Sequence, residues 1–320
     1  MKTHTLNRMM ALMLILLLLQ SACRKNHSNY PPEVNIVGWT ERTHTSMNFE
    51  ISATYYTSSE PVNCGLCWST EPDPDLSDKV AMLTTSNPYF ELTASGLTPN
   101  TSYYFRAFAI GESTTNYSRS FRCTTLGEPI TDVEGNSYYT IRIGDQVWMA
   151  EDLRCRHFNN GDVIAEAVNN SDWNGISPSF CSYPYTYDST VGYIYNHYAA
   201  IDPRGLAPEG WRIPGKEDWE ELFGWLAARS FVSSEIMLTS VLDYGSAAKV
   251  ADSLGFSGRY CGYRTYDGIF YSYLSAAAWW TSTLADSTSA WRVMMRSTST
   301  APDYSYATRK NGYYIRCIRE

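Results

Sequence analysis

Apolar and polar residues alternate along two stretches of the first third of the chain, residues 47–53 and 103–109. A period of two is typical of β-strands that bury one face. Turn-forming Pro, Asp, Asn, Ser and Thr residues separate such stretches at 58–61, 71–74 and 98–100. Short strands at this spacing predict an all-β sandwich over residues 33–126.

The pattern changes in the second part of the chain. Two strand-like segments, 138–143 and 146–150, flank Gly144-Asp145, which predicts a β-hairpin. From Lys216 onward the apolar residues recur with the period of a helix, and its expected buried face consists of Trp219, Leu222, Phe223 and Leu226.

Further elements are expected closer to the C-terminus. A second short helix is predicted around residues 246–254, where Gly255 would end it. Strands are predicted at 291–296, 304–308 and 313–318. One or two helices against antiparallel strands make residues 128–320 an α+β domain.

The N-terminal segment has the pattern of a targeting signal. Lys2 and Arg8 precede an apolar run of 11 residues at 9–19, which is shorter than the roughly 20 residues of a membrane-spanning helix. The run fits the core of a signal peptide over residues 1–22. Small residues before Cys23 resemble a bacterial lipoprotein cleavage site, which predicts a lipidated tether over residues 23–32. Plain secretion with cleavage near Ala22 is the alternative.

This N-terminal signal predicts where the protein is located and how it is attached to the membrane. No later stretch of 18 apolar residues occurs, so the N-terminal lipid on Cys23 is the expected membrane anchor. We therefore expect an outer-membrane lipoprotein of the cell envelope. Arg24-Lys25 is the opposite of the acidic run that resembles a surface-export signal, so periplasmic and outer-face orientations both stay open.

Composition excludes one class of partner. The 320 residues carry a net charge of −8, with 25 basic against 33 acidic side chains. Without a basic surplus, binding to the phosphate backbone of a nucleic acid is not expected. The 25 Tyr and 10 Trp residues instead predict a large aromatic core with some aromatic surface.

Eight cysteines raise the question of disulfides or metal. Without Cys23 seven remain, an odd number, so at least one thiol would stay outside any internal pairing. Cys64 and Cys67 form a CxxC motif, but no second CxxC or His pair completes a metal site. Because residues three apart on a strand face opposite sides, we expect neither a direct pairing of the two nor a metal or other cofactor.

Two segments of the predicted sandwich resemble a known module. Residues 96–107, with Leu97 before a turn and Tyr103 after it, resemble the E–F corner of a fibronectin type III domain. In that module the Leu fills the core and the Tyr locks the corner. Residues 65–70 resemble the variant common in bacterial surface lipoproteins, and such domains are usually spacers or adhesion modules.

The second part resembles the Fibrobacter succinogenes major paralogous domain. Its opening run, residues 132–153, is similar to the family hallmark, and later landmarks follow in the same order. These landmarks are 158–161, 192–196, 208–214, 261–264, 279–283 and 315–319. The resemblance implies a C-type-lectin-like fold, because 210–214 also resembles the start of a helix in formylglycine-generating enzymes and their lectin-like relatives. Trp211, Trp279 and Trp280 are expected in the core.

The resemblance does not transfer a disulfide map. The family often has a Cys where this chain has Leu206, so Cys181 lacks its usual partner. Cys261 and Cys317 are the candidate pair. The metal-holding thiols of the cysteine-oxidising relatives and the calcium-binding triplets of lectins have no counterpart here.

Few side chains suggest catalysis. The carboxylates at 217, 218, 220 and 221 are expected on a solvated helix face, and His157 and His197 are expected to be packed or surface residues. Tyrosines that share a strand face present flat amphipathic surfaces to a sugar or a protein, although they can equally tile a core. The candidate ligand-binding residues are Tyr271 with Tyr273 and Tyr304 with Tyr306.

The sequence thus predicts a non-enzymatic, lipid-anchored envelope protein that recognises a glycan or a protein ligand. A self-associating structural subunit of a surface layer or fimbria is the alternative. An enzyme related to the formylglycine-generating enzymes is the third reading, and it requires two buried thiols or a carboxylate pair at the floor of a pocket.

Overall fold

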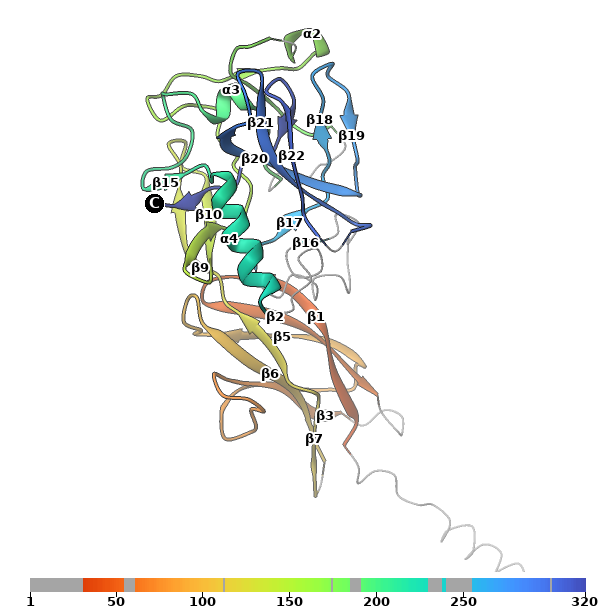
Figure 1. Ribbon diagram of the computed structural model, residues 1–320. Coiled ribbons are helices and arrows are strands. Elements are labelled where there is room, and N and C mark those ends of the chain that lie inside the picture. Colours follow the sequence, from red (N-terminus) through yellow and green to blue (C-terminus); the bar gives the residue numbers. More distant parts are fainter. Residues whose placement is uncertain are drawn as a thin grey trace, which may run out of the picture.

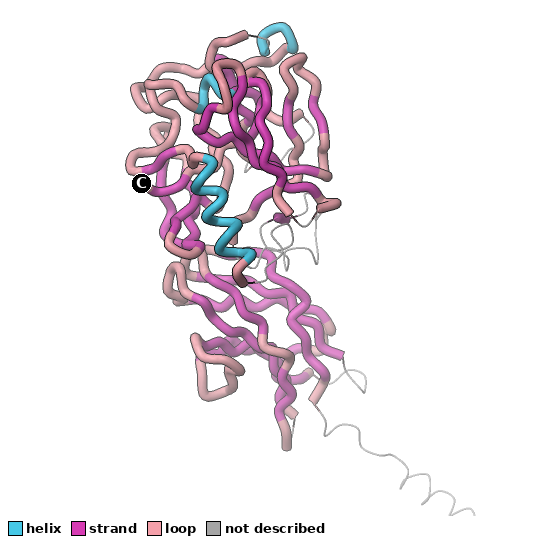
Figure 2. Tube along the Cα trace, viewed as in Figure 1, coloured by secondary structure: helices cyan, strands magenta, loops and turns pink. Residues whose placement is uncertain are grey.

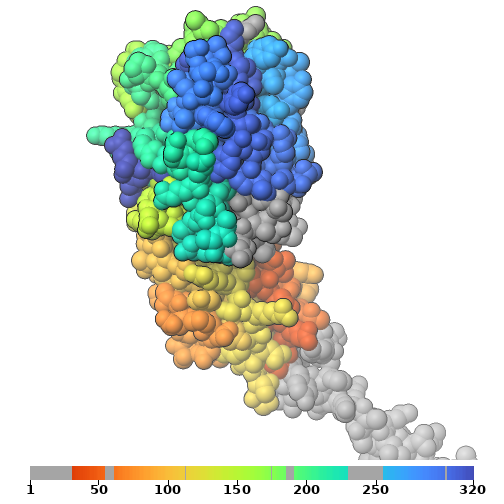
Figure 3. All heavy atoms as spheres, viewed as in Figure 1, coloured from red at the N-terminus to blue at the C-terminus, as the bar shows by residue number. Residues whose placement is uncertain are grey.

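The computed structural model describes residues 31–54, 61–111, 113–173, 175–184, 191–229, 238–239, 255–299 and 301–320. These residues form two bodies that lie end to end, a β-sandwich and a mixed domain (Figure 1). Strands run through both bodies, whereas the described helices lie in the second alone (Figure 2). The two bodies are in contact where they meet (Figure 3).

The first body has two antiparallel sheets around one apolar core. One sheet consists, in spatial order, of β1 (Glu33–Arg42), β2 (Ser46–Thr54) and β5 (Tyr89–Ser95). The other consists of β4 (Lys79–Thr85), β3 (Val62–Ser69), β6 (Ser102–Ile110) and β7 (Thr115–Tyr117), and β8 (Phe121–Thr124) also pairs with β6.

The predicted sandwich is confirmed by its strands and by its corner. Alternate residues of β2 and β6 face the core, as the period of two requires. Leu97 is buried in this core, and the Tyr103 hydroxyl accepts a hydrogen bond from the Thr98 amide at 3.1 Å. This bond closes the corner before β6 in the manner of a tyrosine corner.

The second body contains several small sheets. One consists of β15 (Trp211–Arg212), β24 (Ile318–Arg319), β11 (Gln146–Met149), β10 (Ser137–Ile143) and β9 (Gly127–Thr131). Another consists of β12 (Ala165–Glu166), β13 (Ser179–Cys181), β14 (Ile194–Asn196), β23 (Gly312–Tyr313), β18 (Tyr263–Arg264) and β19 (Phe270–Tyr271). The longest strands form a third sheet of β20 (Ala276–Leu284), β21 (Ser289–Arg296) and β22 (Asp303–Thr308). A parallel pair joins β16 (Leu238–Thr239) to β17 (Gly258–Arg259).

Three helices accompany these sheets in the described residues: α2 (Asn170–Trp173), α3 (His197–Ala200) and α4 (Lys216–Ala227). The predicted helix is confirmed as α4, which buries the four residues expected from the spacing. The predicted hairpin is confirmed as β10 and β11, with Gly144 at a φ of +63° in its turn. Trp211, Trp279 and Trp280 are buried as expected.

Two sequence predictions differ from the structure or lie outside it. The strand expected over 313–318 is interrupted, because β23 ends at Tyr313 and β24 begins only at Ile318. Between them Arg316 turns into the core, where an extended pairing would not place it. The second helix expected at 246–254 lies outside the described residues, as do the signal peptide and Cys23.

The two bodies are joined without a spacer between their cores. Leu126 lies two residues after the end of β8 and packs in the same core cluster as Trp219 of the second body. Its amide donates to the Thr43 carbonyl and its carbonyl accepts from the Asn100 amide, each at 3.1 Å. The last residue of the sandwich therefore belongs to the packing of the next domain.

Candidate functional site

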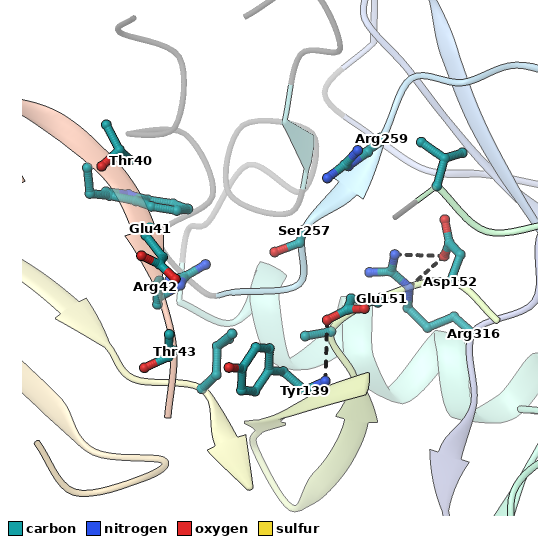
Figure 4. Close-up of a pocket in the computed structure, with 14 residues that line it drawn as sticks. Thr40, Glu41, Arg42, Thr43, Tyr139, Glu151, Asp152, Ser257, Arg259 and Arg316 are labelled. Carbon is teal, nitrogen blue, oxygen red and sulfur yellow. Dashed lines mark hydrogen bonds and ion pairs between the residues drawn. The ribbon is translucent and has the colours of Figure 1, made fainter. Parts of the chain in front are cut away.

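A pocket of about 330 Å³ lies where the two bodies meet (Figure 4). The end of β1 and the residue after it form one wall, and segments around 150 and 257 and near the C-terminus form the other. The lining residues are Trp39, Thr40, Glu41, Arg42, Thr43, Leu126, Tyr139, Ala150, Glu151, Asp152, Val191, Ser257, Arg259 and Arg316. A pocket between domains is a common place for a ligand.

The sandwich wall is held by a buried arginine. The Arg42 guanidinium lies 4.6 Å from the ring centroid of Trp39, and its Nη1 donates to the Cys123 sulfur at 3.2 Å. Gly255 approaches it from the second domain with a φ of +89°, and a Cβ there would lie 3.1 Å from Arg42 Cζ. The close approach requires glycine on both counts.

The opposite wall is built around a buried ion pair. Asp152 Oδ1 accepts hydrogen bonds from Arg316 Nε at 2.8 Å and from Arg316 Nη2 at 2.7 Å. The indole Nε1 of Trp279 donates to the same oxygen at 2.7 Å. Arg316 Nη1 donates to the carbonyl of Phe256. Arg316 Cζ also lies over the Phe256 ring, 4.2 Å from its centroid. These contacts fix both charged groups and leave them little freedom.

Glu151 and Tyr139 form the floor nearest the sandwich. Glu151 Oε2 accepts from Arg154 Nη1 at 2.8 Å, and its Oε1 accepts from the Tyr139 amide at 3.4 Å. Partial burial raises the pKa of the Tyr139 phenol, and the nearby Glu151 and Glu41 charges raise it further. The phenol is therefore a neutral hydroxyl throughout the physiological range.

The pocket offers balanced polar chemistry. Three carboxylates and three guanidinium groups line it, and Thr40, Thr43, Ser257 and Tyr139 add hydroxyls. None of the 14 lining residues is a cysteine or a histidine. Among the described residues no group of three or more His, Cys, Asp or Glu side chains is placed to hold a metal ion. This arrangement suits recognition of a polar ligand by hydrogen bonds.

The predicted tyrosine sites lie elsewhere, and one of the two pairs was wrongly placed. Tyr271 is 45% exposed at the end of β19, but Tyr273 is not on that strand. Ser272 between them has a φ of +59°, which ends the extended backbone. The Tyr273 ring instead stacks on Tyr183 with centroids 5.4 Å apart, so Tyr271 and Tyr273 do not share a strand face.

The second pair shares β22, as predicted, but differs in burial. The Tyr304 hydroxyl donates to the carbonyl of Trp219 at 3.1 Å, and its ring packs edge-on against Phe223 of α4. Tyr306 is 63% exposed and contacts Trp291. Tyr304 is thus half-buried and packs against α4, whereas Tyr306 is exposed.

The candidate disulfide is not formed. Cys261 lies in the core cluster under α4, whereas Cys317 lies in a different cluster together with Cys155. All seven cysteines that the structure describes are buried thiols. As expected for positions three apart on β3, Cys64 faces the sandwich core while the Cys67 thiol donates to the Pro74 carbonyl outside it.

The other flagged side chains have structural roles. Burial raises the pKa of Asp218, but hydrogen bonds from Arg212 and the Gly215 amide outweigh it and hold the pKa below its ordinary value. His157 contacts Glu134 through Nδ1 at 2.6 Å near the surface, and His197 is fully buried. Neither histidine lines the junction pocket.

Sequence reasoning missed the residues that line the pocket. Asp152 and Arg316 both stand in segments that carry the family resemblance, 132–153 and 315–319, which was the available signal. Their pairing spans 164 positions and follows from no local period.

The helices of the described residues are all too short or too polar to cross a membrane.

Comparison with known proteins finds one family. The model of the Fibrobacter succinogenes major domain matches residues 141–319, more than half of the chain. The match covers Asp152, Ser257, Arg259 and Arg316 of the pocket and leaves out the sandwich wall. No curated protein matches the chain.

Solved structures resemble a part of the chain. The sensor domain of the anti-sigma factor RsgI4 of Pseudobacteroides cellulosolvens is 23% identical over 31% of this chain and 98% of its own, with a TM-score of 0.24. The fibronectin type III domain of human fibronectin type III domain containing protein 3 is 17% identical over 32% of this chain and 88% of its own, with a TM-score of 0.23. Scores this low support no argument about function, and the sandwich rests on its own strand pairing.

Proposed function

The chain belongs to the family of the Fibrobacter succinogenes major domain, and on that premise we propose that it is a lipid-anchored protein of the cell envelope that recognises a glycan or a protein ligand without catalysing a reaction. The proposal includes a C-type-lectin-like character for the second domain. The observation that carries it is the junction pocket, because both domains contribute polar side chains to one cavity.

The lining favours binding over catalysis. The Asp152 and Glu151 carboxylates are each paired with an arginine, which supports a role in orienting a ligand rather than in transferring a proton. Cysteine oxidation of the formylglycine-generating type needs two neighbouring thiols, and the lining contains none. What the pocket supplies is a fixed set of donors and acceptors, which is the usual basis of specificity in small binding sites.

The start of the folded body supports the anchoring proposal. The Asn116 side chain donates to the carbonyls of Pro31 and Pro32 at 2.9 and 3.3 Å, which fixes the beginning of β1. Pro31 follows Cys23 by eight positions. A lipid on Cys23 would therefore hold the sandwich within about 27 Å of the bilayer surface, and the second domain would project beyond it (Figure 1).

Two experiments test the proposal. Incorporation of a labelled fatty acid in a bacterial host should occur in the native protein and be lost in Cys23→Ser. For recognition, the purified protein is screened against a glycan array and against envelope extracts. Glu41 lines the pocket with an exposed side chain, so Glu41→Trp should block the cavity without disturbing the core.

The matched control is Glu71→Trp, which adds the same bulk at an exposed turn of the sandwich that does not line the pocket. Binding that is lost in Glu41→Trp and kept in Glu71→Trp supports recognition at the junction. A protein that binds no glycan and no envelope protein contradicts it.

Self-association is a second candidate because of one edge strand. Within the described residues β4 pairs only with β3, and its side chains Val80 and Met82 are exposed, the latter at 53%. An apolar edge can accept a strand from another chain. Sedimentation velocity of the native protein against Met82→Lys distinguishes the two functions, since only an assembly through β4 would dissociate.

A further inference from the structure

Asp152 Oδ2 is the carboxylate oxygen that Arg316 and Trp279 leave without a hydrogen bond. We propose that the junction pocket binds one neutral sugar unit, and that Asp152 Oδ2 accepts hydrogen bonds from its hydroxyls. This proposal rests on the recognition function above and adds the chemical class of the ligand.

The two oxygens of Asp152 have different surroundings. Oδ1 accepts three hydrogen bonds, two from Arg316 and one from Trp279. Oδ2 accepts none from the described residues, although the Asp152 side chain is only 8% exposed and lines the pocket. Figure 4 shows Oδ2 pointing away from Arg316. A carboxylate oxygen that receives no hydrogen bond from the protein, on a side chain that lines a cavity, is available to accept one from a ligand hydroxyl.

The charges around the pocket favour a neutral ligand. Glu41, Glu151 and Asp152 oppose Arg42, Arg259 and Arg316, so the lining has no net charge. A hydroxyl both donates and accepts, and therefore matches a wall on which carboxylates and guanidinium groups are neighbours. A cationic or anionic ligand would meet repulsion from one half of this set.

The size of the cavity favours a short ligand. About 330 Å³ lies at the lower end of the roughly 300–1,000 Å³ typical of small-molecule pockets. One sugar unit fits that volume more readily than a long oligosaccharide. The half-buried Tyr139 adds an aromatic surface against which a sugar ring can pack.

The test uses calorimetry with the purified protein and five probes. These are glucose, galactose and mannose, with glucosamine and glucuronic acid as their charged counterparts. At least one neutral hexose should bind, and Asp152→Asn should weaken it at least tenfold. Because Trp279 donates to Asp152, its indole N–H resonance should also shift on binding.

Two further variants keep the test decisive if Asp152→Asn does not fold. Ser257 has a φ of +52°, which Asn tolerates, so Ser257→Asn should fill the cavity and abolish binding. Asp218→Asn breaks another aspartate–arginine pair outside the lining and should leave binding unchanged.

The outcomes separate this proposal from the function it rests on. Tight binding of glucosamine or glucuronic acid alone would overturn the neutral class. A glycan or protein ligand whose affinity survives Ser257→Asn would overturn the site but leave recognition standing. A protein that binds nothing, on the array, in extracts or among the probes, would overturn both.

Discussion

Asp152 and Arg316 are joined through a single carboxylate oxygen, with Arg316 Nε at 2.8 Å and Nη2 at 2.7 Å from Asp152 Oδ1. Both side chains are almost fully removed from solvent, and 164 positions separate them. Two buried charges are tolerated only when they compensate each other and their remaining groups are hydrogen-bonded. The pair therefore fastens the C-terminus to the segment after β11 and shapes one wall of the pocket.

Removing one partner should be costly. Arg316→Met leaves a buried carboxylate without its cation, and we expect the free energy of unfolding to fall by about 3–5 kcal/mol. Urea denaturation followed by tryptophan fluorescence measures it. Arg212→Met is the control, because its ion pair with Asp218 is partly exposed and such pairs are worth about 0–1 kcal/mol. Equal losses in both variants would contradict the role given to burial.

Replacing glycine by alanine should change the stability of the protein in opposite directions at Gly65 and at Gly224. At Gly65 an added Cβ would lie 2.2 Å from the Phe108 ring and 2.6 Å from the Ala81 carbonyl. Gly65→Ala should therefore destabilise the sandwich by about 1–3 kcal/mol or more.

Gly224 lies inside α4 with no atom within 4 Å of such a Cβ. Gly224→Ala should stabilise the protein by about 0.5–1 kcal/mol, because alanine is the better helix former. Thermal unfolding of the two variants gives the comparison, and the same sign of change in both would rule the explanation out.

Local patterns predicted the elements whose residues are neighbours in sequence. The alternation of β2 and β6 follows from a period of two and the buried face of α4 from a period of 3.6. The corner around Leu97 and Tyr103 was expected from the resemblance to fibronectin type III domains, and the structure has it too. The Asp152–Arg316 pair could not be found this way, because it depends on how separate segments pack. For Tyr271 and Tyr273 the period failed where a left-handed residue, Ser272, interrupts the strand.

Tyr304 and Tyr306 lie on the same strand, β22, but only Tyr304 packs against α4, so their removal should affect stability differently. Tyr304→Ala removes a hydrogen bond to Trp219 and a ring contact with Phe223, so the free energy of unfolding should fall by about 2–4 kcal/mol. Tyr306→Ala should change it by less than about 1 kcal/mol. Denaturation curves decide, and a larger loss at Tyr306 would mean that its contact with Trp291 matters more than its exposure suggests.

The thiols should resist modification in the folded protein. Burial raises the pKa of Cys67 and Cys155 to about 12 and that of Cys181 to about 11, so at pH 8 only about a thousandth or less of each is thiolate. Iodoacetamide should label these residues slowly before denaturation. After denaturation without reductant, mass spectrometry should find all seven cysteines from Cys64 onward alkylated, and a protected pair would reveal a disulfide.

His197 predicts how stability depends on pH. Burial lowers its pKa from 6.5 to about 4, and the neighbouring Arg309 charge acts in the same direction although the hydrogen bond with the Thr281 carbonyl opposes it. Its Nδ1 has no partner among the described residues, so a protonated ring would bury an unsatisfied donor.

The unfolded chain therefore takes up the proton at a higher pH than the folded protein does. The contribution of His197 is fully present above pH 6.5 and is lost as the pH falls toward 4, by roughly 2–4 kcal/mol in total. His197→Gln removes the titration while keeping a donor for Thr281. Unfolding free energies of both proteins at pH 7, 5.5 and 4.5 should converge as the pH falls, and a constant difference would show that His197 stays neutral in both states.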